Sequence, residues 1–148
     1  MIRIAGINKN DYINGEGISV SLFLQGCPFH CEGCHNPETW DENGGNEVNE
    51  QDLIKEIIEA ICANGIIRNL SILGGEPFST PKKILFINEL IKQVKQKYPN
   101  IIICIWTGFT YETLKNGLDM QYILENINYL IDGPFVLLER DITLKWRR

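Results

Sequence analysis

Long apolar runs are missing from this sequence of 148 residues, and so is any excess of positive charge. A membrane-spanning helix needs about 20 consecutive apolar residues, and no stretch approaches that length. The N-terminus lacks the charged and then apolar segments of a signal peptide. The formal net charge is -5, whereas nucleic acids and anionic membranes attract basic surfaces. We therefore expect a cytoplasmic protein that binds neither nucleic acid nor membrane.

The chain also lacks internal repeats, low-complexity segments and any stretch that reads as an interdomain linker. Hydrophobic residues make up 44% and charged residues 22%, and the apolar segments are spread from end to end. This composition argues for a folded globular protein and against disorder. Given the length, we expect a single domain over residues 1–148.

The pattern of apolar residues predicts alternating strands and helices. Strands are expected over residues 1–7, 18–25, 70–73, 101–106 and 129–131. Helices are expected from an N-cap at Asn49 to about Asn64, from Pro81 to Val94, and over residues 111–126, with a loop over 43–46. This order is typical of βαβ units, so we expect an α/β fold around a parallel sheet.

Three unusual segments directly follow expected strands. They are the cysteine-rich segment from Cys27, the Gly74-Gly75-Glu76-Pro77 segment, and the Trp106-Thr107-Gly108-Phe109 segment. Ligands of such sheets bind at the carboxyl ends of the strands. We therefore expect the three segments to meet at one edge of the sheet.

Histidine is scarce, with only His30 and His35, and the five cysteines are odd in number. Cys27, Cys31 and Cys34 lie within eight residues, which fits a reducing compartment and a metal site better than a disulfide framework. Three thiolates suit an iron–sulfur cluster with one iron left open to another ligand.

Two other interpretations of the cysteines stay open. A structural zinc site could combine the three thiolates with His30 or His35, and a thiol redox pair could use two of them. Cys62, on an expected helix face, and Cys104, in an expected buried strand, are interpreted as core residues rather than ligands.

The spacing of the three cysteines and the continuation Cys34-His35-Asn36-Pro37 resemble the radical S-adenosylmethionine superfamily. Within it, the chain resembles the activating enzymes of glycyl-radical enzymes, above all those of the anaerobic ribonucleoside-triphosphate reductase. Further similar segments occur in the family's order, at Asn14-Gly15-Glu16-Gly17 and Asp132-Gly133-Pro134-Phe135 as well as at the two loops named above. The resemblance implies a partial, laterally open (β/α) barrel.

The resemblance also implies the roles of individual residues. Cys27, Cys31 and Cys34 would bind a 4Fe-4S cluster and be the catalytic ligands, and S-adenosyl-L-methionine would bind the fourth iron. Contacts to this cosubstrate are implied for Gly33, Cys34, His35, Gly74, Gly75, Glu76 and Trp106.

The implied activity is reductive cleavage of S-adenosylmethionine to a 5′-deoxyadenosyl radical, which installs a glycyl radical on the reductase. The implied electron source is a one-electron donor such as flavodoxin or ferredoxin. Alternatives are activation of a formate-lyase-type enzyme, radical chemistry on a small molecule, or a noncatalytic zinc module.

The chain departs from the family pattern at two places. Gly33 stands where the superfamily favours an aromatic residue, so the adenine would contact backbone or another side chain such as Phe29 or His35. The chain ends at Lys145-Trp146-Arg147-Arg148, where the family continues into a polar tail, so we expect a shortened or altered C-terminus.

Overall fold

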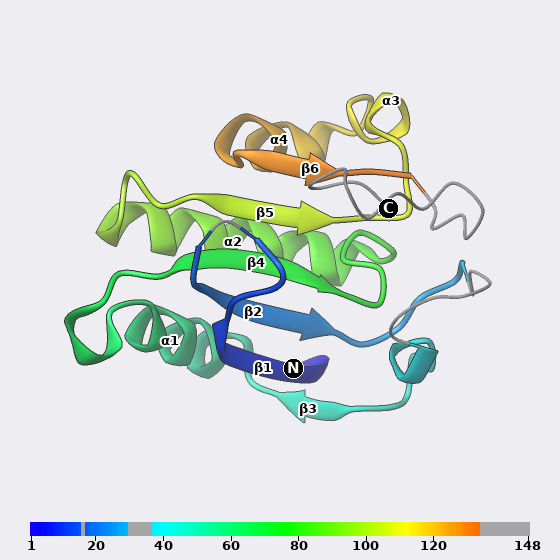
Figure 1. Cartoon of the computed structure of the whole chain (residues 1–148). Helices are drawn as coiled ribbons and strands as arrows, with labels where there is room; N and C mark the ends of the chain where they lie inside the picture. The colour runs from blue at the N-terminus through cyan, green and yellow to red at the C-terminus, as the bar shows by residue number, and fades with distance from the viewer. Residues whose placement is uncertain (16, 30–36, 134–148) are drawn as a thin grey trace.

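A computed structural model of the chain describes residues 1–15, 17–29 and 37–133, which form a mixed α/β fold around one six-stranded sheet (Figure 1). The strand order is β3-β1-β2-β4-β5-β6. The strands are β1 (Ile2–Asp11), β2 (Ser19–Leu24), β3 (Asn46–Val48), β4 (Asn69–Gly74), β5 (Ile103–Trp106) and β6 (Tyr129–Ile131).

Four neighbouring strands, β2, β4, β5 and β6, run parallel, which confirms the expected βαβ arrangement. β1 pairs antiparallel with both β2 and β3. Within the described residues, the two edge strands β3 and β6 do not pair with each other, so the sheet is open.

Two long helices, α1 (Glu50–Ile61) and α2 (Pro81–Lys97), lie behind the sheet in the view of Figure 1. As expected, Asn49 caps α1, because its side chain accepts a hydrogen bond from Asp52 N at 3.0 Å. The Thr80 hydroxyl caps α2 by accepting from Lys83 N at 3.2 Å, and Pro81 occupies the first turn. The shorter α3 (Tyr111–Leu114) and α4 (Gln121–Asn126) precede β6.

The main hydrophobic core lies between the sheet and these helices. Leu22, Ile72 and Ile105 on the central strands and Ile57 and Ile87 on the long helices are fully buried in it. The alternate strand positions face the opposite side of the sheet. There Ser71 Oγ donates to Asn14 O at 2.8 Å, so the loop between β1 and β2 lies across this second face.

The structure differs from the sequence-based expectation in three elements. The short strand β3 begins at Asn46, where only a loop was expected, and β1 extends to Asp11 rather than to residue 7. The expected helix over residues 111–126 is wrong as one element. It is divided into α3, a 3-10 turn (Leu118–Met120) and α4, since Gly117 has an extended backbone that ends the first helical turn.

No helix in the described part of the chain is long and apolar enough to cross a bilayer.

Candidate functional site

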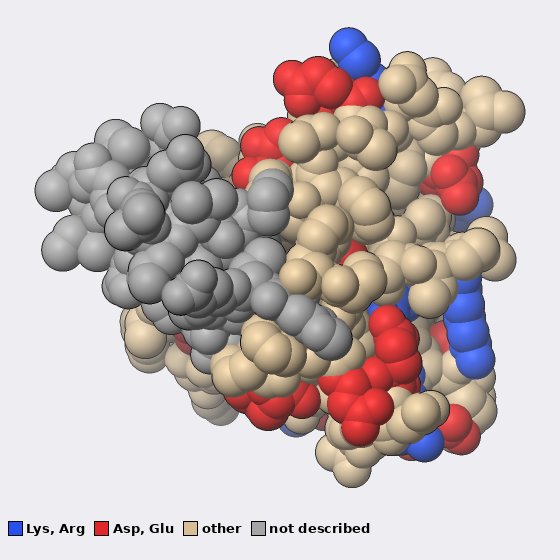
Figure 2. Space-filling view, turned by 90° about the vertical axis from the view of Figure 1, so that its right-hand side faces the viewer, with Lys and Arg blue, Asp and Glu red and all other residues tan. Residues whose placement is uncertain are grey.

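The loops that follow β2, β4 and β5 meet at the carboxyl edge of the parallel strands, as the sequence predicts. Figure 2 looks onto this edge, where red acidic side chains are more prominent than blue basic ones. Hydrogen bonds and close backbone contacts join each of these loops to the next.

Cys27 lies just beyond β2, half-buried, with its backbone held in place. Cys27 N donates to Trp40 O at 3.1 Å, and Gly26 N donates to Thr39 O at 2.6 Å. The neighbouring Gln25 side chain is buried and donates to the carbonyls of residues 38 and 41. Hydrogen bonds next to Cys27 therefore join the segment before the remaining cysteines to the segment after them. Outside the described residues lie Cys31, Gly33, Cys34 and His35.

The Gly74-Gly75-Glu76 loop packs directly on the residue before Cys27. Gly75 N donates to Leu24 O and Glu76 N donates to Gly26 O, both at 2.8 Å. A Cβ atom added to Gly75 would come within 2.4 Å of the Gly26 carbonyl oxygen. Gly74 has a φ of 104°, which side-chain-bearing residues rarely adopt. Both glycines are thus explained by close backbone approach.

The Glu76 carboxylate joins this loop to the loop after β5. Its Oε1 accepts from Gly108 N at 2.6 Å, while its Oε2 accepts from Thr107 Oγ1 at 2.6 Å and from Phe78 N at 3.0 Å. The side chain is 1% exposed. Glu76 therefore ties the two loops together, and its contact with a cosubstrate amine stays a prediction.

The loop after β5 also touches the cysteine loop and the end of β6. The rings of Phe29 and Phe109 pack edge to face with centroids 5.0 Å apart, and a Cβ on Gly108 would fall within 2.6 Å of the Phe29 ring. Gly133 N donates to Phe109 O at 2.9 Å, and Asp132 Oδ2 accepts from Tyr111 N at 2.8 Å. The Asp132-Gly133 segment therefore belongs to the same edge.

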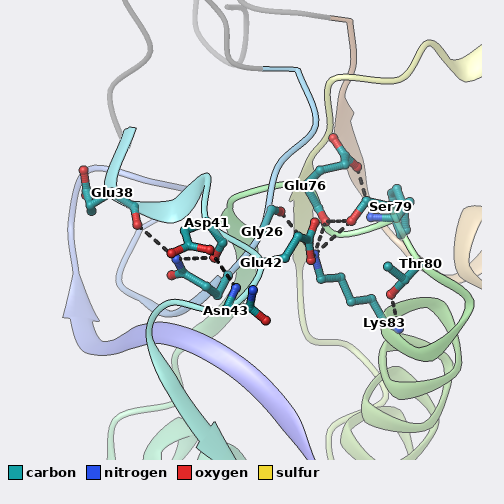
Figure 3. A network of polar contacts seen from close by, with 11 residues as sticks. Gly26, Glu38, Asp41, Glu42, Asn43, Glu76, Ser79, Thr80 and Lys83 are labelled. Atoms are coloured by element: carbon teal, nitrogen blue, oxygen red, sulfur yellow. Dashed lines mark hydrogen bonds and ion pairs between the residues drawn. The ribbon is translucent and has the colours of Figure 1, made fainter.

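A buried lysine lies where the cysteine loop and the Gly-Gly-Glu loop meet (Figure 3). Lys83 extends from α2, and its Nζ donates to Gly26 O at 3.1 Å, Glu76 O at 3.3 Å and Ser79 Oγ at 2.9 Å. The Glu42 carboxylate lies 3.8 Å from Nζ. Burial lowers the pKa of Lys83 below its ordinary value, and the negative charges of Glu42, Glu76 and Cys27 oppose this shift.

The other residues singled out in the sequence lie in different surroundings. Trp106, at the end of β5, is half-buried at the same edge as the Gly-Gly-Glu loop. Cys104 is 1% exposed in the middle of β5, which confirms its interpretation as a core residue. Cys62 is only half-buried at the C-cap of α1, so it lies at the margin of the core.

The described part of the site suits an anionic cluster bound by thiolates. Backbone hydrogen bonds hold Cys27 beyond the end of β2, and the carbonyl of the preceding residue, Gly26, accepts from the buried ammonium of Lys83 at 3.1 Å. In residues 1–15, 17–29 and 37–133 taken alone, no three side chains of metal-binding type come together. The other two thiols of the motif, Cys31 and Cys34, are outside these ranges.

Comparison with known proteins decides the family. A family model described as a 4Fe-4S single cluster domain matches residues 13–148. The anaerobic ribonucleoside-triphosphate reductase-activating protein of Vibrio cholerae is 33% identical over 137 residues, which cover 93% of this chain and 86% of that protein. This chain belongs to the same family. The activating protein of Escherichia coli K12 is 34% identical over 93% of this chain and 87% of its own. The activating protein of bacteriophage T4 is 33% identical over 93% and 83%.

Membership of this family supports an iron–sulfur cluster on the chain. Sequence reasoning missed Lys83, and it placed Thr107 at this edge within the Trp106-Thr107-Gly108-Phe109 segment without assigning it a role. Lys83 had a readable signal, because it occupies the same helical stripe as Ile87, Leu90 and Val94, where an apolar residue is expected. Thr107 had no comparable signal, since its role depends on the position of Glu76 across the sheet edge.

Proposed function

We propose that this chain activates an anaerobic ribonucleoside-triphosphate reductase by installing a glycyl radical on it. In this proposal Cys27, Cys31 and Cys34 bind a 4Fe-4S cluster that supplies one electron for the reductive cleavage of S-adenosylmethionine to methionine and a 5′-deoxyadenosyl radical. The family relationship supports both the cluster and the kind of partner, because the relatives are named as activating proteins of that reductase.

The observation that carries the proposal is the direct contact between the Cys27 loop and the Gly-Gly-Glu loop. Glu76 N donates to Gly26 O, and Gly75 leaves no room there for a side chain. A cosubstrate bound at both loops would therefore have its reacting group beside the thiolate ligands. Such fixed proximity is what a single electron transfer followed by bond cleavage requires.

The remaining residues of the edge have supporting roles in this proposal. Gly74 and Gly75 let their loop pack against the backbone of Leu24 and Gly26, and their backbone is proposed to bind the methionyl amine. Trp106, at the end of β5, is proposed to contact the cosubstrate from the same edge. Glu76 holds the loop after β5 in place through Thr107 and Gly108. Gly33, Cys34 and His35 are proposed to lie beside the adenine and ribose.

The open sheet fits a substrate that is itself a protein. We propose that the sheet is the partial, laterally open barrel of a single radical S-adenosylmethionine domain over residues 1–148. In the part of the chain that the structure describes, β6 is an edge strand, and this edge would admit a loop of the reductase that carries the glycine. The docked partner would exclude water from the reacting groups. A flavodoxin or ferredoxin is the proposed source of the electron.

The experiment is an anaerobic assay of the reconstituted chain with reductant, S-adenosylmethionine and the reductase. We expect 5′-deoxyadenosine by chromatography and a glycyl radical on the reductase by electron paramagnetic resonance. Cys31→Ala should abolish both products, because two thiolates do not complete the ligand set. Cys62→Ala is the matched control, since Cys62 lies at the C-cap of α1, and it should retain both.

Wild-type activity in the Cys31→Ala variant would exclude the assigned ligands. Activation of a formate-lyase-type enzyme instead of the reductase would change the partner but keep the chemistry. Stoichiometric zinc with no iron in the purified protein would replace the proposal with a structural zinc module.

A further inference from the structure

Lys83 is buried at the junction of the two site loops. The residue is 5% exposed, and no other lysine is buried in the part of the chain that the structure describes. Burying an ammonium group is costly unless it is hydrogen-bonded and paired with opposite charge. Packing of α2 against the sheet therefore does not by itself account for a buried lysine at position 83.

The contacts of Lys83 connect groups that belong to different loops. Gly26 O, just before Cys27, accepts from Lys83 Nζ at 3.1 Å and from Glu76 N at 2.8 Å. Glu76 O accepts from the same ammonium at 3.3 Å. One cation thus holds the backbone that leads into the cysteine segment against the backbone of the Gly-Gly-Glu loop, as Figure 3 shows.

Lys83 Nζ lies 3.1 Å from the carbonyl oxygen of Gly26, the residue before Cys27, so its charge would act on a cluster bound at Cys27. An iron–sulfur cluster on three thiolates is anionic and gains one more negative charge when it is reduced. A fixed cation beside it stabilises the reduced form more than the oxidised form, and the charges around a cluster are among the factors that set its potential. The surface carboxylate of Glu42, 3.8 Å from Lys83 Nζ, acts in the opposite direction.

We propose that Lys83 is a positioning residue that holds the Cys27 loop against the Gly75-Glu76 backbone and raises the reduction potential of the cluster. The inference rests on the proposed function, because it needs a cluster on Cys27. Nothing in it requires Lys83 to touch the cosubstrate.

The test is a redox titration of the anaerobically reconstituted full chain, followed by electron paramagnetic resonance of the reduced cluster. Lys83→Met keeps the length of the side chain and removes its charge. We expect the equilibrium constant for cluster reduction to fall by about tenfold, which is about 59 mV for a one-electron couple. Lys82→Met is the matched control, because the exposed Lys82 directly precedes Lys83 on the same helix. The reduction potential of the cluster in this variant should stay at the wild-type value.

Glu42→Gln provides an independent test that leaves Lys83 in place. Its side chain is 53% exposed, so the substitution should not impair folding, and the potential should move in the opposite direction to that of Lys83→Met. Lys83→Gln, which keeps a hydrogen-bond donor at this position and removes the charge, decides the proposal if Lys83→Met fails to fold or to assemble a cluster. Its potential should fall as that of Lys83→Met would, and an unchanged potential would overturn the role of Lys83.

The outcomes separate the two proposals. A normal cluster in Lys83→Met with the potential of Lys82→Met would overturn the role of Lys83 and leave the proposed function intact. An unchanged or lowered potential in Glu42→Gln would overturn it as well. If the wild-type chain assembles no iron–sulfur cluster, both the proposed function and the role of Lys83 are wrong.

Discussion

Replacing Glu76 with glutamine changes one atom in the side chain that joins two loops of the site. The carboxylate accepts hydrogen bonds from two backbone amides and one hydroxyl, and it is 1% exposed. An amide can supply only one acceptor oxygen. In either orientation, its NH₂ group would therefore face a buried donor, at Gly108 N or at Phe78 N and Thr107 Oγ1.

The cost can be worked from these contacts. A hydrogen bond to a charged group contributes about 1.5–3 kcal/mol, and a buried donor left without a partner costs about 1–3 kcal/mol. Both figures describe the same lost contact and are not added, so we expect Glu76→Gln to lower the free energy of unfolding by about 1.5–3 kcal/mol. That is a large share of the roughly 5–15 kcal/mol typical of a small domain, yet it leaves the variant folded.

The assay is urea unfolding of the metal-free chain under reducing conditions. Glu89→Gln is the control, because Glu89 is exposed on α2 and accepts a hydrogen bond from Gln93 on the surface, so its free energy of unfolding should change by under about 0.5 kcal/mol. If the midpoint of Glu76→Gln equals that of Glu89→Gln, Glu76 does not tie the two loops together.

Three further predictions use other parts of the structure. Gly75→Ala should lower the amount of iron bound per chain after reconstitution, because the added Cβ would lie 2.4 Å from the Gly26 carbonyl oxygen. Gly6→Ala is the control, because no atom lies within 4 Å of its added Cβ, and it should bind iron normally. Asp11→Asn should destabilise the chain most at neutral pH. Burial would raise the pKa of Asp11, but the hydrogen bonds that its carboxylate accepts from Ile13 and Asn14 outweigh burial and lower the pKa, so its contribution is present above the unfolded-state pKa and is lost as the pH falls through the folded-state pKa. In urea titrations the difference in the free energy of unfolding between the wild type and Asp11→Asn should therefore disappear at acid pH. Ile87→Ala in the core should lower the free energy of unfolding by about 2–5 kcal/mol in the same assay. Leu85→Ala is its control, because Leu85 is 68% exposed, and it should lower that free energy by under about 0.5 kcal/mol.

The sequence predicted the parallel strands and the two long helices because their signals are local. The apolar spacing of α1 and α2, the cap at Asn49 and the buried run before Trp106 each depend on residues close in sequence. β3 was missed because it has three residues, and its pairing with Ile2–Ile4 is a contact between distant segments. Gly117 interrupted the third helical stretch although the apolar spacing continued through it.

The candidate site was predictable in its motifs but not in its connections. Three loops after three parallel strands had to meet at one edge, and the structure confirms that they do. The role of Glu76 as a tie to Thr107 and Gly108 required knowing how far the strands extend and where the loops turn. A carboxylate in a glycine-rich loop is equally compatible with a ligand contact, and the sequence alone gives no sign of the bonds to Thr107 and Gly108.

Electron paramagnetic resonance of the anaerobically reconstituted, dithionite-reduced chain, with and without S-adenosylmethionine, tests the central claim most directly. The account predicts a reduced-cluster signal whose shape changes when S-adenosylmethionine is added, because the proposed cosubstrate would bind the iron that the three cysteines would leave open. A protein with stoichiometric zinc and no iron-dependent signal, or a cluster signal indifferent to S-adenosylmethionine, would contradict it.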